Sequence, residues 1–330
     1  MDPIWRLARR LGGGEFVSGQ TLASEFGLSR SAIWNMVQAL EGKGLKMQAV
    51  RGRGYRLPDA VEWFGETEIR AAIPSRWRGL LDRLEVCCET DSTNARLAGQ
   101  TACPAGRAHA CVAEYQTQGR GRRGRHWMMP PAAGICLSVA WRFERPPVGL
   151  SALGPAAGLA ARQGLLDLGI EGVGLKWPND LVWQDAKLGG ILVELRAEGQ
   201  GPAFVVIGVG INDRLSSGTI QAIRDSGGQR PVDLATVSGV DRPGRNQIAG
   251  AVIGRLLELL SCCADVGVDQ MCADWATADV LAGREVLVSL GDSVVTGIAR
   301  GLAADGALLL DTADGVRRLT AGDVSVRLQS

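Results

Sequence analysis

Residues 114–127 read Glu-Tyr-Gln-Thr-Gln-Gly-Arg-Gly-Arg-Arg-Gly-Arg-His-Trp, and this stretch decides how the rest of the chain is interpreted. It lies between two apolar runs with strand character, residues 110–113 and 134–141. Glycine allows the backbone to approach a ligand closely, and arginine offers a fixed fork of donors that suits phosphate or carboxylate. The stretch therefore predicts an anion-binding loop held between strands. A solvated basic loop or an arginine-rich nucleic-acid tract is the alternative.

The composition is that of a globular protein with more than one domain. The chain has 330 residues, of which 46% are hydrophobic and 22% charged, and its net charge is +1. This charge argues against a uniformly basic nucleic-acid binder. No apolar run approaches the roughly 20 residues that span a bilayer, and the N-terminus has no apolar signal core. We expect a cytoplasmic protein with no membrane partner.

Cysteine and histidine usage gives no indication of a metal site. The eight cysteines include no Cys-x-x-Cys motif, and only two histidines are available as further ligands. A zinc site is therefore not expected, and we predict no protein-bound metal and reduced thiols.

Residues 1–57 carry the local basic balance, with nine Lys and Arg residues against four acidic ones. Apolar residues at helical spacing up to Leu11, a short helix at 21–26, and a third helix capped by Ser29 predict a helix-turn-helix. Residues 45–57 read as a hairpin with a basic tip, which makes the unit a winged helix-turn-helix. The alternative is a small helical interaction domain with a solvated positive face. The sequence leaves open whether Trp34 is buried or contacts bases.

Helices and strands alternate from residue 67 to about 275. Residues 150–168 and 246–264 predict amphipathic helices, and residues 189–195 and 204–210 predict strands. Five short strands at even spacing, separated by Gly and Asp turns, then occupy 285–328 and predict a small SH3-like barrel.

Three further polar segments accompany the arginine loop. Residues 91–94 (Asp-Ser-Thr-Asn) follow a strand and suit a helix N-cap, a ligand contact, or both. Residues 175–180 (Leu-Lys-Trp-Pro-Asn-Asp) have turn chemistry, but Lys187 follows closely before a buried strand. Residues 205–212 (Val-Val-Ile-Gly-Val-Gly-Ile-Asn) give only a weak dinucleotide signal, because Asp213 breaks Gly-x-Gly-x-x-Gly.

Taken in this order, the four segments resemble the biotin protein ligases, and specifically the bifunctional type that also represses the biotin operon. The resemblance runs through nearly the whole chain and is closest at residues 119–125, 176–180 and 187–194. It implies an α+β fold with a winged helix-turn-helix at 1–60, a mixed-sheet, class II synthetase-like catalytic domain at 61–278 and the SH3-like barrel at 279–330. It also implies transfer of biotin, through biotinyl-5′-AMP, to one lysine of the biotin carboxyl carrier domain of acetyl-CoA carboxylase.

The resemblance also implies roles for residues of this chain. The biotin contacts would be Ser92, Thr93, Asn94, Gln116, Arg120, Gly121, Arg122, Lys187 and Gly190. The ATP contacts would be Arg122, Arg125, Trp127, Lys176, Asn179 and Asn212, with Mg²⁺ accompanying the triphosphate. Catalysis would rest on Lys187, Arg122, Lys176 and Asp180. Operator DNA would meet Ser29, Arg30, Ser31, Asn35, Gln38, Arg51 and Arg53, in a homodimer formed when biotinyl-AMP is bound.

Several other interpretations stay open at this point. Lipoate ligases resemble biotin ligases in fold, a regulator could retain a dead ligand-sensing domain, and a monofunctional ligase could carry a vestigial DNA-binding domain. One departure from the family concerns adenine. Some relatives cover the base with an aromatic residue after the Gly-x-Gly-x-Asn turn, but no Phe, Trp or Tyr occurs here between Phe204 and Trp275. Trp127 is one candidate to replace it.

Overall fold

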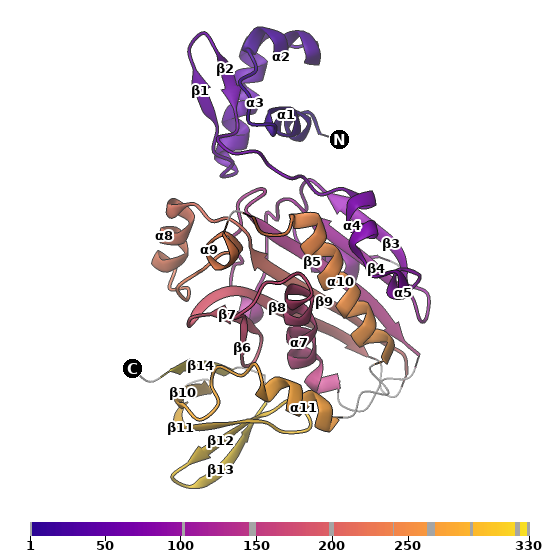
Figure 1. The fold of residues 1–330 in the computed structure, drawn as a ribbon, viewed down its shortest axis with the longest axis vertical. Coiled ribbons are helices and arrows are strands. Elements are labelled where there is room, and N and C mark those ends of the chain that lie inside the picture. The colour runs from indigo at the N-terminus through magenta and orange to yellow at the C-terminus, as the bar shows by residue number, and fades with distance from the viewer. Residues whose placement is uncertain are drawn as a thin grey trace.

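The structure is a computed structural model that describes residues 2–100, 103–144, 150–197, 201–239, 241–262, 268–290, 293–320 and 324–328. Three parts follow one another along the long axis, with the N-terminal part at the top of Figure 1, a large sheet and its helices in the middle, and a small β-domain at the bottom. Within the described ranges, no helix is long and apolar enough to cross a membrane.

The N-terminal part is the predicted winged helix-turn-helix. Its elements are α1 (Pro3–Leu11), α2 (Gly19–Phe26), α3 (Arg30–Gly42), β1 (Gln48–Val50) and β2 (Gly54–Arg56). Ser29 caps α3 by accepting a hydrogen bond from Ala32 N, as predicted. Gly27 takes φ +64° at the end of α2, a conformation that glycine adopts easily, and so turns the chain into α3. The side chain of Trp34 is 53% exposed, so it belongs to the outer face and not to the core.

The middle part is built on a seven-stranded mixed sheet in the order β3-β4-β5-β9-β8-β7-β6. β3 and β4 are parallel neighbours, and the other pairs are antiparallel. The strands are β3 (Leu81–Cys87), β4 (Ala108–Ala113), β5 (Gly134–Phe143), β6 (Gly174–Lys176), β7 (Asp180–Trp183), β8 (Ala186–Ala197) and β9 (Ala203–Asn212). The helical elements are α4 (Glu66–Ala72), α5 (Ser75–Arg78), α6 (Thr93–Ala98), η1 (Arg122–Gly124), η2 (Leu150–Ala152), α7 (Leu153–Leu166), α8 (Ser217–Asp225), α9 (Leu234–Ser238), α10 (Arg245–Cys262) and α11 (Val268–Ala276).

The two faces of this sheet differ because side chains alternate along each strand. In β5, Ile135, Leu137 and Val139 belong to the large core that also includes α7 and α10. Ser138 and Ala140 point to the opposite face, where α6 packs. The predicted helices at 150–168 and 246–264 correspond to α7 and α10, although residues 263–264 lie outside the described ranges.

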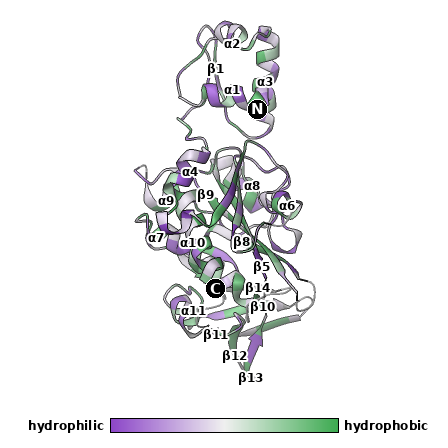
Figure 2. Ribbon diagram, turned by 90° about the vertical axis from the view of Figure 1, so that its right-hand side faces the viewer, coloured by the Kyte–Doolittle hydropathy of each residue, from purple (hydrophilic) through white to green (hydrophobic). Residues whose placement is uncertain are grey.

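The C-terminal part is one antiparallel sheet of five strands in the order β13-β12-β11-β10-β14. The strands are β10 (Glu285–Leu290), β11 (Ser293–Leu302), β12 (Leu308–Thr312), β13 (Gly315–Leu319) and β14 (Val324–Leu328), each at a position predicted for the SH3-like barrel. In Figure 2 the outermost strand β13 is coloured hydrophilic, in agreement with its mostly exposed side chains. Trp177 Nε1 donates to the Gly306 carbonyl at 2.9 Å, so this domain is tied to the turn that precedes β7.

Candidate active site

One cavity of about 490 Å³ brings the four predicted segments together on the sheet face opposite α7 and α10. Every residue predicted to contact biotin or ATP, and every predicted catalytic residue, lines this cavity: Ser92, Thr93, Asn94, Gln116, Arg120, Gly121, Arg122, Arg125, Trp127, Lys176, Asn179, Asp180, Lys187, Gly190 and Asn212. Segments separated by more than 100 residues in the sequence therefore form a single site.

Small residues on the sheet face make room for the cavity. Gly208 and Gly210 of β9 and Gly190 of β8 line it, while their neighbours Ile207, Val209 and Ile211 point into the core. A Cβ at Gly208 would overlap Asn94 Oδ1, and a Cβ at Gly210 would lie 2.7 Å from the Trp127 indole. Glycine is required here by the close approach of side chains to the strand, not by backbone conformation.

A buried hydrogen-bond network forms one end of the cavity. Gln116 Oε1 accepts from Thr93 N at 2.8 Å and from Thr93 Oγ1 at 3.1 Å. Ser138 Oγ lies 2.7 Å from Thr93 Oγ1 and 2.6 Å from Asn94 Oδ1. Asn94 Nδ2 donates to Glu194 Oε2 at 2.8 Å. This end presents short, oriented polar groups within apolar walls, which suits a neutral polar ring system.

The helix cap predicted at residues 91–94 is present, and the same residues line the cavity. Ser92 Oγ accepts from Ala95 N at 3.5 Å and caps α6, while Ser92, Thr93 and Asn94 all line the cavity. The first turn of α6 thus places two neighbouring side chains in the buried network.

The other end of the cavity is strongly cationic. It is lined by five Arg and Lys side chains (Arg122, Arg123, Arg125, Lys176 and Lys187), and Asp180 is the one carboxylate among the described lining residues. Arg120 lies nearer the network, with its Nη2 3.5 Å from Glu194 Oε1. Lys187 Nζ lies 2.6 Å from Asp180 Oδ1, which fixes the amine at the start of β8. Such a concentration of positive charge in a partly enclosed site favours a polyanionic ligand.

The arginine loop closes on itself and lines the cavity. Gly121 N donates to the Arg125 carbonyl at 2.7 Å, and Trp127 N donates to the Gly119 carbonyl at 2.8 Å. Arg123 and Gly124 both have positive φ, +60° and +69°, which makes the sharp turn at the tip. Arg122 Nη1 reaches Asn179 Oδ1 at 3.3 Å, so the loop contacts the opposite wall.

Trp127 forms the wall of the cationic end beside β9. Its ring lies 5.8 Å from Lys187 Nζ and packs with Ile223 of α8 in a small apolar cluster. Asn212, the last residue of β9, donates from Nδ2 to the Lys187 and Val232 carbonyls at 3.2 and 2.9 Å. An apolar slot beside cationic groups can hold a flat heteroaromatic ring.

The sequence interpretation missed several residues of the site. Ser138 and Glu194 orient Asn94, and Gly208 lies directly beneath it. The signal for Ser138 was a single hydroxyl in an otherwise apolar strand. Glu194 gave a similar signal. Ile191 and Val193 of the same strand point into the core, so the alternation of side chains places Glu194 on the opposite face, which carries the cavity.

A buried ion pair supports the strand end that carries Gln116. Glu114 is fully buried and accepts from Arg245 Nη1 at 2.9 Å and from Phe64 N at 2.5 Å. Arg245 also donates to the Gly134 carbonyl at 2.7 Å. The pair therefore joins the ends of β4, β5 and α10 to the segment between the winged helix-turn-helix and α4.

The winged helix-turn-helix contacts the chain next to the cavity. Glu89 Oε2 accepts from Trp5 Nε1 at 3.1 Å, and Glu89 Oε1 pairs with Lys43 Nζ at 2.9 Å. Trp5 and Lys43 also contact the ring of Tyr115. The side chains predicted to meet DNA (Ser29, Arg30, Ser31, Asn35, Gln38, Arg51 and Arg53) are exposed, although Ser29 also caps α3 and Arg53 stacks on Phe16.

Fold and site together define a class of protein, a ligase-like enzyme with a polar pocket and a polyanion pocket on one sheet, joined to a winged helix-turn-helix. Comparison with known proteins gives the family. Residues 86–212 match the biotin/lipoate A/B protein ligase family, residues 282–327 the biotin protein ligase C-terminal domain, and residues 7–56 a helix-turn-helix domain. The chain is 34% identical to the bifunctional ligase/repressor BirA of Escherichia coli over 322 residues, which cover 98% of this chain and 96% of that protein.

Other relatives agree with this result. The chain is 36% identical over 256 residues to the biotin–[acetyl-CoA-carboxylase] ligase of Mycobacterium tuberculosis, covering 76% of this chain and 90% of that protein. The structure of biotin protein ligase from Aquifex aeolicus with biotin and ATP superposes with a TM-score of 0.60 at 26% identity, covering 76% of this chain and 99% of that one. The chain belongs to the biotin protein ligase family, with the domain order of its ligase/repressor members.

Proposed function

We propose that this protein joins biotin to ATP as biotinyl-5′-AMP and then transfers the biotinyl group to one lysine of a biotin carboxyl carrier domain of acetyl-CoA carboxylase. One observation carries the proposal: a single cavity has a neutral, hydrogen-bonding end and a cationic end. Biotin has a neutral bicyclic urea at one end and a carboxylate at the other. The hydrogen-bonding end suits the bicyclic urea, and the cationic end suits the carboxylate and the phosphate to which it becomes joined in the adenylate.

The neutral end would hold the bicyclic ring. Ser92, Thr93, Asn94 and Gln116 would contact the urea, with the main chain of Arg120 and Gly121 above it and Gly190 beside the chain of biotin. The network of Thr93, Asn94, Gln116 and Ser138 is already hydrogen-bonded, so these groups are oriented before biotin arrives. Preorganised polar groups lose little freedom on binding, which supports affinity.

The cationic end would bring two anions together. In the first step a biotin carboxylate oxygen attacks the α-phosphorus of ATP, a P–O bond forms, and pyrophosphate leaves. Carboxylate and triphosphate repel each other, so fixed positive charge is the main requirement. Arg122 and Arg125 of the loop and Lys176 at the end of β6 would hold phosphate oxygens. Asn179 and Asn212 would line the nucleotide region. Trp127 would pack against the adenine.

Lys187 would act in both steps. Its amine would lie beside the biotin carboxylate during adenylation and beside the acyl phosphate afterwards. In the second step the carrier lysine amine attacks the acyl carbon, and AMP leaves with the electron pair of the broken C–O bond. Asp180, 2.6 Å from Lys187 Nζ, holds that amine in place and would orient the incoming amine.

Magnesium would accompany the triphosphate. Mg²⁺ keeps several waters and is held mainly by phosphate oxygens with one or two protein oxygens. The oxygens of Asp180 and Asn212 are of the right kind, and Asp180 is the one carboxylate among the described residues that line the cavity. Bound Mg²⁺ supplies charge neutralisation at the phosphates. Calorimetry of ATP binding with and without Mg²⁺ tests this point without turnover.

We also propose that the protein represses biotin synthesis genes when biotinyl-AMP is bound. A homodimer would present two copies of α3 and its wing to a two-fold operator. Helix α3 exposes Arg30, Asn35 and Gln38, and the wing exposes Arg51. The domain boundaries that we propose are 1–60, 61–278 and 279–330, and the proposed location is the cytoplasm.

The test is transfer to a carrier domain. The protein is incubated with biotin, ATP, Mg²⁺ and a carrier domain, and mass spectrometry follows the +biotin adduct on a single carrier lysine. Lipoate in place of biotin serves as the competing substrate, because the matched family also contains lipoate ligases. Absence of biotin transfer overturns the proposal, and preferential transfer of lipoate assigns the chain to the other branch.

A further inference from the structure

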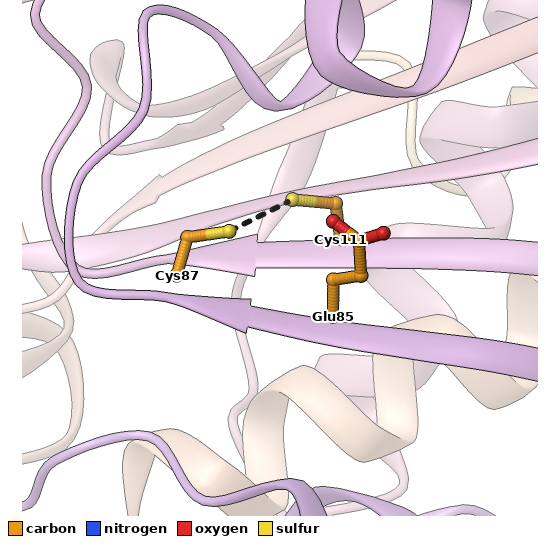
Figure 3. Close-up of side chains that lie close together, drawn as sticks. All are labelled: Glu85, Cys87 and Cys111. Atoms are coloured by element: carbon orange, nitrogen blue, oxygen red, sulfur yellow. Dashed lines mark hydrogen bonds between the residues drawn. The ribbon is translucent and has the colours of Figure 1, made fainter. Parts of the chain in front are cut away.

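Two cysteines lie close together on the sheet face that packs against α6, outside the cavity. Cys87 of β3 and Cys111 of β4 have their Sγ atoms 4.0 Å apart (Figure 3). The two strands are parallel, and their register pairs Cys111 with Glu85. Because side chains alternate along a strand, Glu85 and Cys87 share one face with Cys111. Neither cysteine takes part in the proposed reaction.

The two thiols differ in their access to solvent. Cys87 is partly exposed at the carboxyl end of β3, whereas Cys111 is fully buried. Cys111 packs with Leu97 of α6 and Ala140 of β5 in a small apolar cluster. A solute can therefore reach the Cys87 thiol. The buried Cys111 thiol can react only with a group that is already bonded to the Cys87 sulfur.

The surroundings favour a thiolate at Cys87. The pKa of Cys87 is lowered to about 7, mainly by the hydrogen bond with the Cys111 thiol and also by the positive charge of Arg96, against the opposing effects of burial and of the Glu85 carboxylate. The same contact with Cys87, together with burial, raises the pKa of Cys111. Thiolate is the reactive form of cysteine, and reactive cysteines occupy electropositive, partly exposed positions.

A metal ion would use the same three side chains, but the charge around them opposes it. Glu85, Cys87 and Cys111 are the metal-capable group found among the described residues. The Glu85 carboxylate already pairs with Arg83 and Arg96 and accepts from Gln100 at 2.9 Å. The Glu85 carboxylate is thus already engaged by two guanidinium groups, and the Arg96 guanidinium beside Cys87 stabilises an anion there and repels a cation. The geometry thus favours thiol chemistry.

We propose that Cys87 and Cys111 form a redox modification site that reacts with low-molecular-weight disulfides. The Cys87 thiolate attacks one sulfur of the small disulfide, and the S–S bond breaks to release one thiolate. Cys111 then gives its proton to the small thiolate released in the first step and attacks the Cys87 sulfur of the mixed disulfide as a thiolate, and the second small thiolate leaves. The protein dithiol is oxidised by two electrons to a Cys87–Cys111 disulfide, and the small disulfide is reduced to two thiols.

The second step requires both the sulfurs and the end of β3 to move. A disulfide needs a sulfur separation of about 2 Å, so the sulfurs must approach by about half of their present distance. Cys87 pairs with Ala113, two residues beyond Cys111, so the two cysteines are diagonal neighbours, whose Cα atoms are roughly 8 Å apart in a regular sheet. A disulfide spans at most about 7 Å between Cα atoms, so its formation pulls the end of β3, where Cys87 is the last residue, toward β4. Since β3 and β4 are hydrogen-bonded neighbours, the linkage requires no new chain contact.

The test uses the full-length reduced protein and oxidised glutathione. After incubation at pH 7.5, free thiols are blocked and the digest is analysed by mass spectrometry. The expected product is a Cys87–Cys111 disulfide in monomeric protein, and Cys111→Ala should stop at Cys87 bonded to glutathione. Cys88→Ser is the matched control, because Cys88 adjoins Cys87 but packs toward the N-terminal core. It should give the same disulfide as the wild type.

A second measurement covers the case in which Cys111→Ala does not fold. The alkylation rate of each cysteine of the wild type is measured between pH 6 and 9 with iodoacetamide. Cys87 should be half-maximal near pH 7, whereas burial raises the pKa of Cys88 and moves its reaction to higher pH. Equal profiles for Cys87 and Cys88, or glutathione that reacts without producing the Cys87–Cys111 linkage, overturn the proposal. Neither readout depends on biotin or ATP.

Discussion

Replacing Gly208 by alanine should weaken biotin binding selectively. The new Cβ would occupy the position of Asn94 Oδ1. Strand β9 cannot retreat, because its neighbours fix it on both sides: Gly208 pairs with Ser138 of β5 and with Leu192 of β8. The Asn94 side chain must therefore move out of the buried network.

The cost follows from the hydrogen bonds that Asn94 makes. It loses the 2.6 Å contact with Ser138 Oγ and the 2.8 Å bond to Glu194 Oε2. A buried hydrogen bond contributes about 1 kcal/mol, and a buried polar group left without a partner costs about 1–3 kcal/mol. We expect a loss of about 2 kcal/mol in biotin binding, about one for each lost bond, which is roughly a 30-fold rise in Kd.

The assay is isothermal titration calorimetry with biotin and, separately, with ATP. Gly210→Ala is the matched variant, two residues along the same face of β9. Its Cβ would lie 2.7–2.8 Å from the Trp127 indole, so it should displace the wall of the nucleotide end. We expect biotin affinity to fall in Gly208→Ala with ATP affinity within about twofold of wild type, and the reverse in Gly210→Ala, with ATP binding about tenfold weaker.

The result that refutes this reasoning is equal loss of both ligands in both variants. That outcome would mean that the two ends of the cavity are not separate subsites. Thermal unfolding of each variant shows whether a loss of affinity comes from a loss of folded protein. Unchanged biotin affinity in folded Gly208→Ala would remove Asn94 from the biotin site.

Three other substitutions test the remaining parts of the site. Arg122→Gly removes the loop contact with Asn179 and should release the adenylate, so that bystander lysines of added albumin become biotinylated; retention of the adenylate through gel filtration at the wild-type level contradicts a closing loop. Lys187→Ala should fold but lose pyrophosphate release by at least about tenfold, and normal release would exclude Lys187 from the first step. Arg245→Ala leaves the carboxylate of Glu114 buried without its partner and should cost about 3–5 kcal/mol in urea unfolding; a loss below about 1 kcal/mol would show that the pair is dispensable.

The sequence predicted the elements well where one periodicity covers a whole segment. The helix-turn-helix followed from helical spacing and the cap at Ser29, and the C-terminal strands followed from regular turns. Strand order was less accessible, because it depends on contacts between distant segments. Nothing in the local pattern of β3 and β4 shows that they are parallel, or that β9 lies between β5 and β8.

The site residues were predictable where their chemistry is unusual for their surroundings, as in the arginine loop or the Lys187 segment. Ser138, Glu194 and Gly208 escaped because a lone polar residue or a glycine in a strand does not by itself show what lies against it. Their importance appears only when β5, β8 and β9 are aligned and the three side-chain positions meet Asn94. The alternation of β9, with apolar residues on one face and Gly208 and Gly210 on the other, was a usable signal. It indicates that this part of the face must admit a side chain or a ligand close to the strand.

The contact between the winged helix-turn-helix and the catalytic part gives a physical basis for joining the two functions. Glu89, held by Trp5 and Lys43, lies three residues before Ser92, and Tyr115, contacted by the same two side chains, directly precedes Gln116. Thr90 N donates to the Tyr115 carbonyl at 3.1 Å, so the two strand ends move as a unit. We expect a ligand that orders these two strand ends to change how the N-terminal domain packs against them. By linkage, a constraint on that domain then changes ligand affinity by the same factor. The residues beside the proposed biotin site therefore also position the DNA-binding domain.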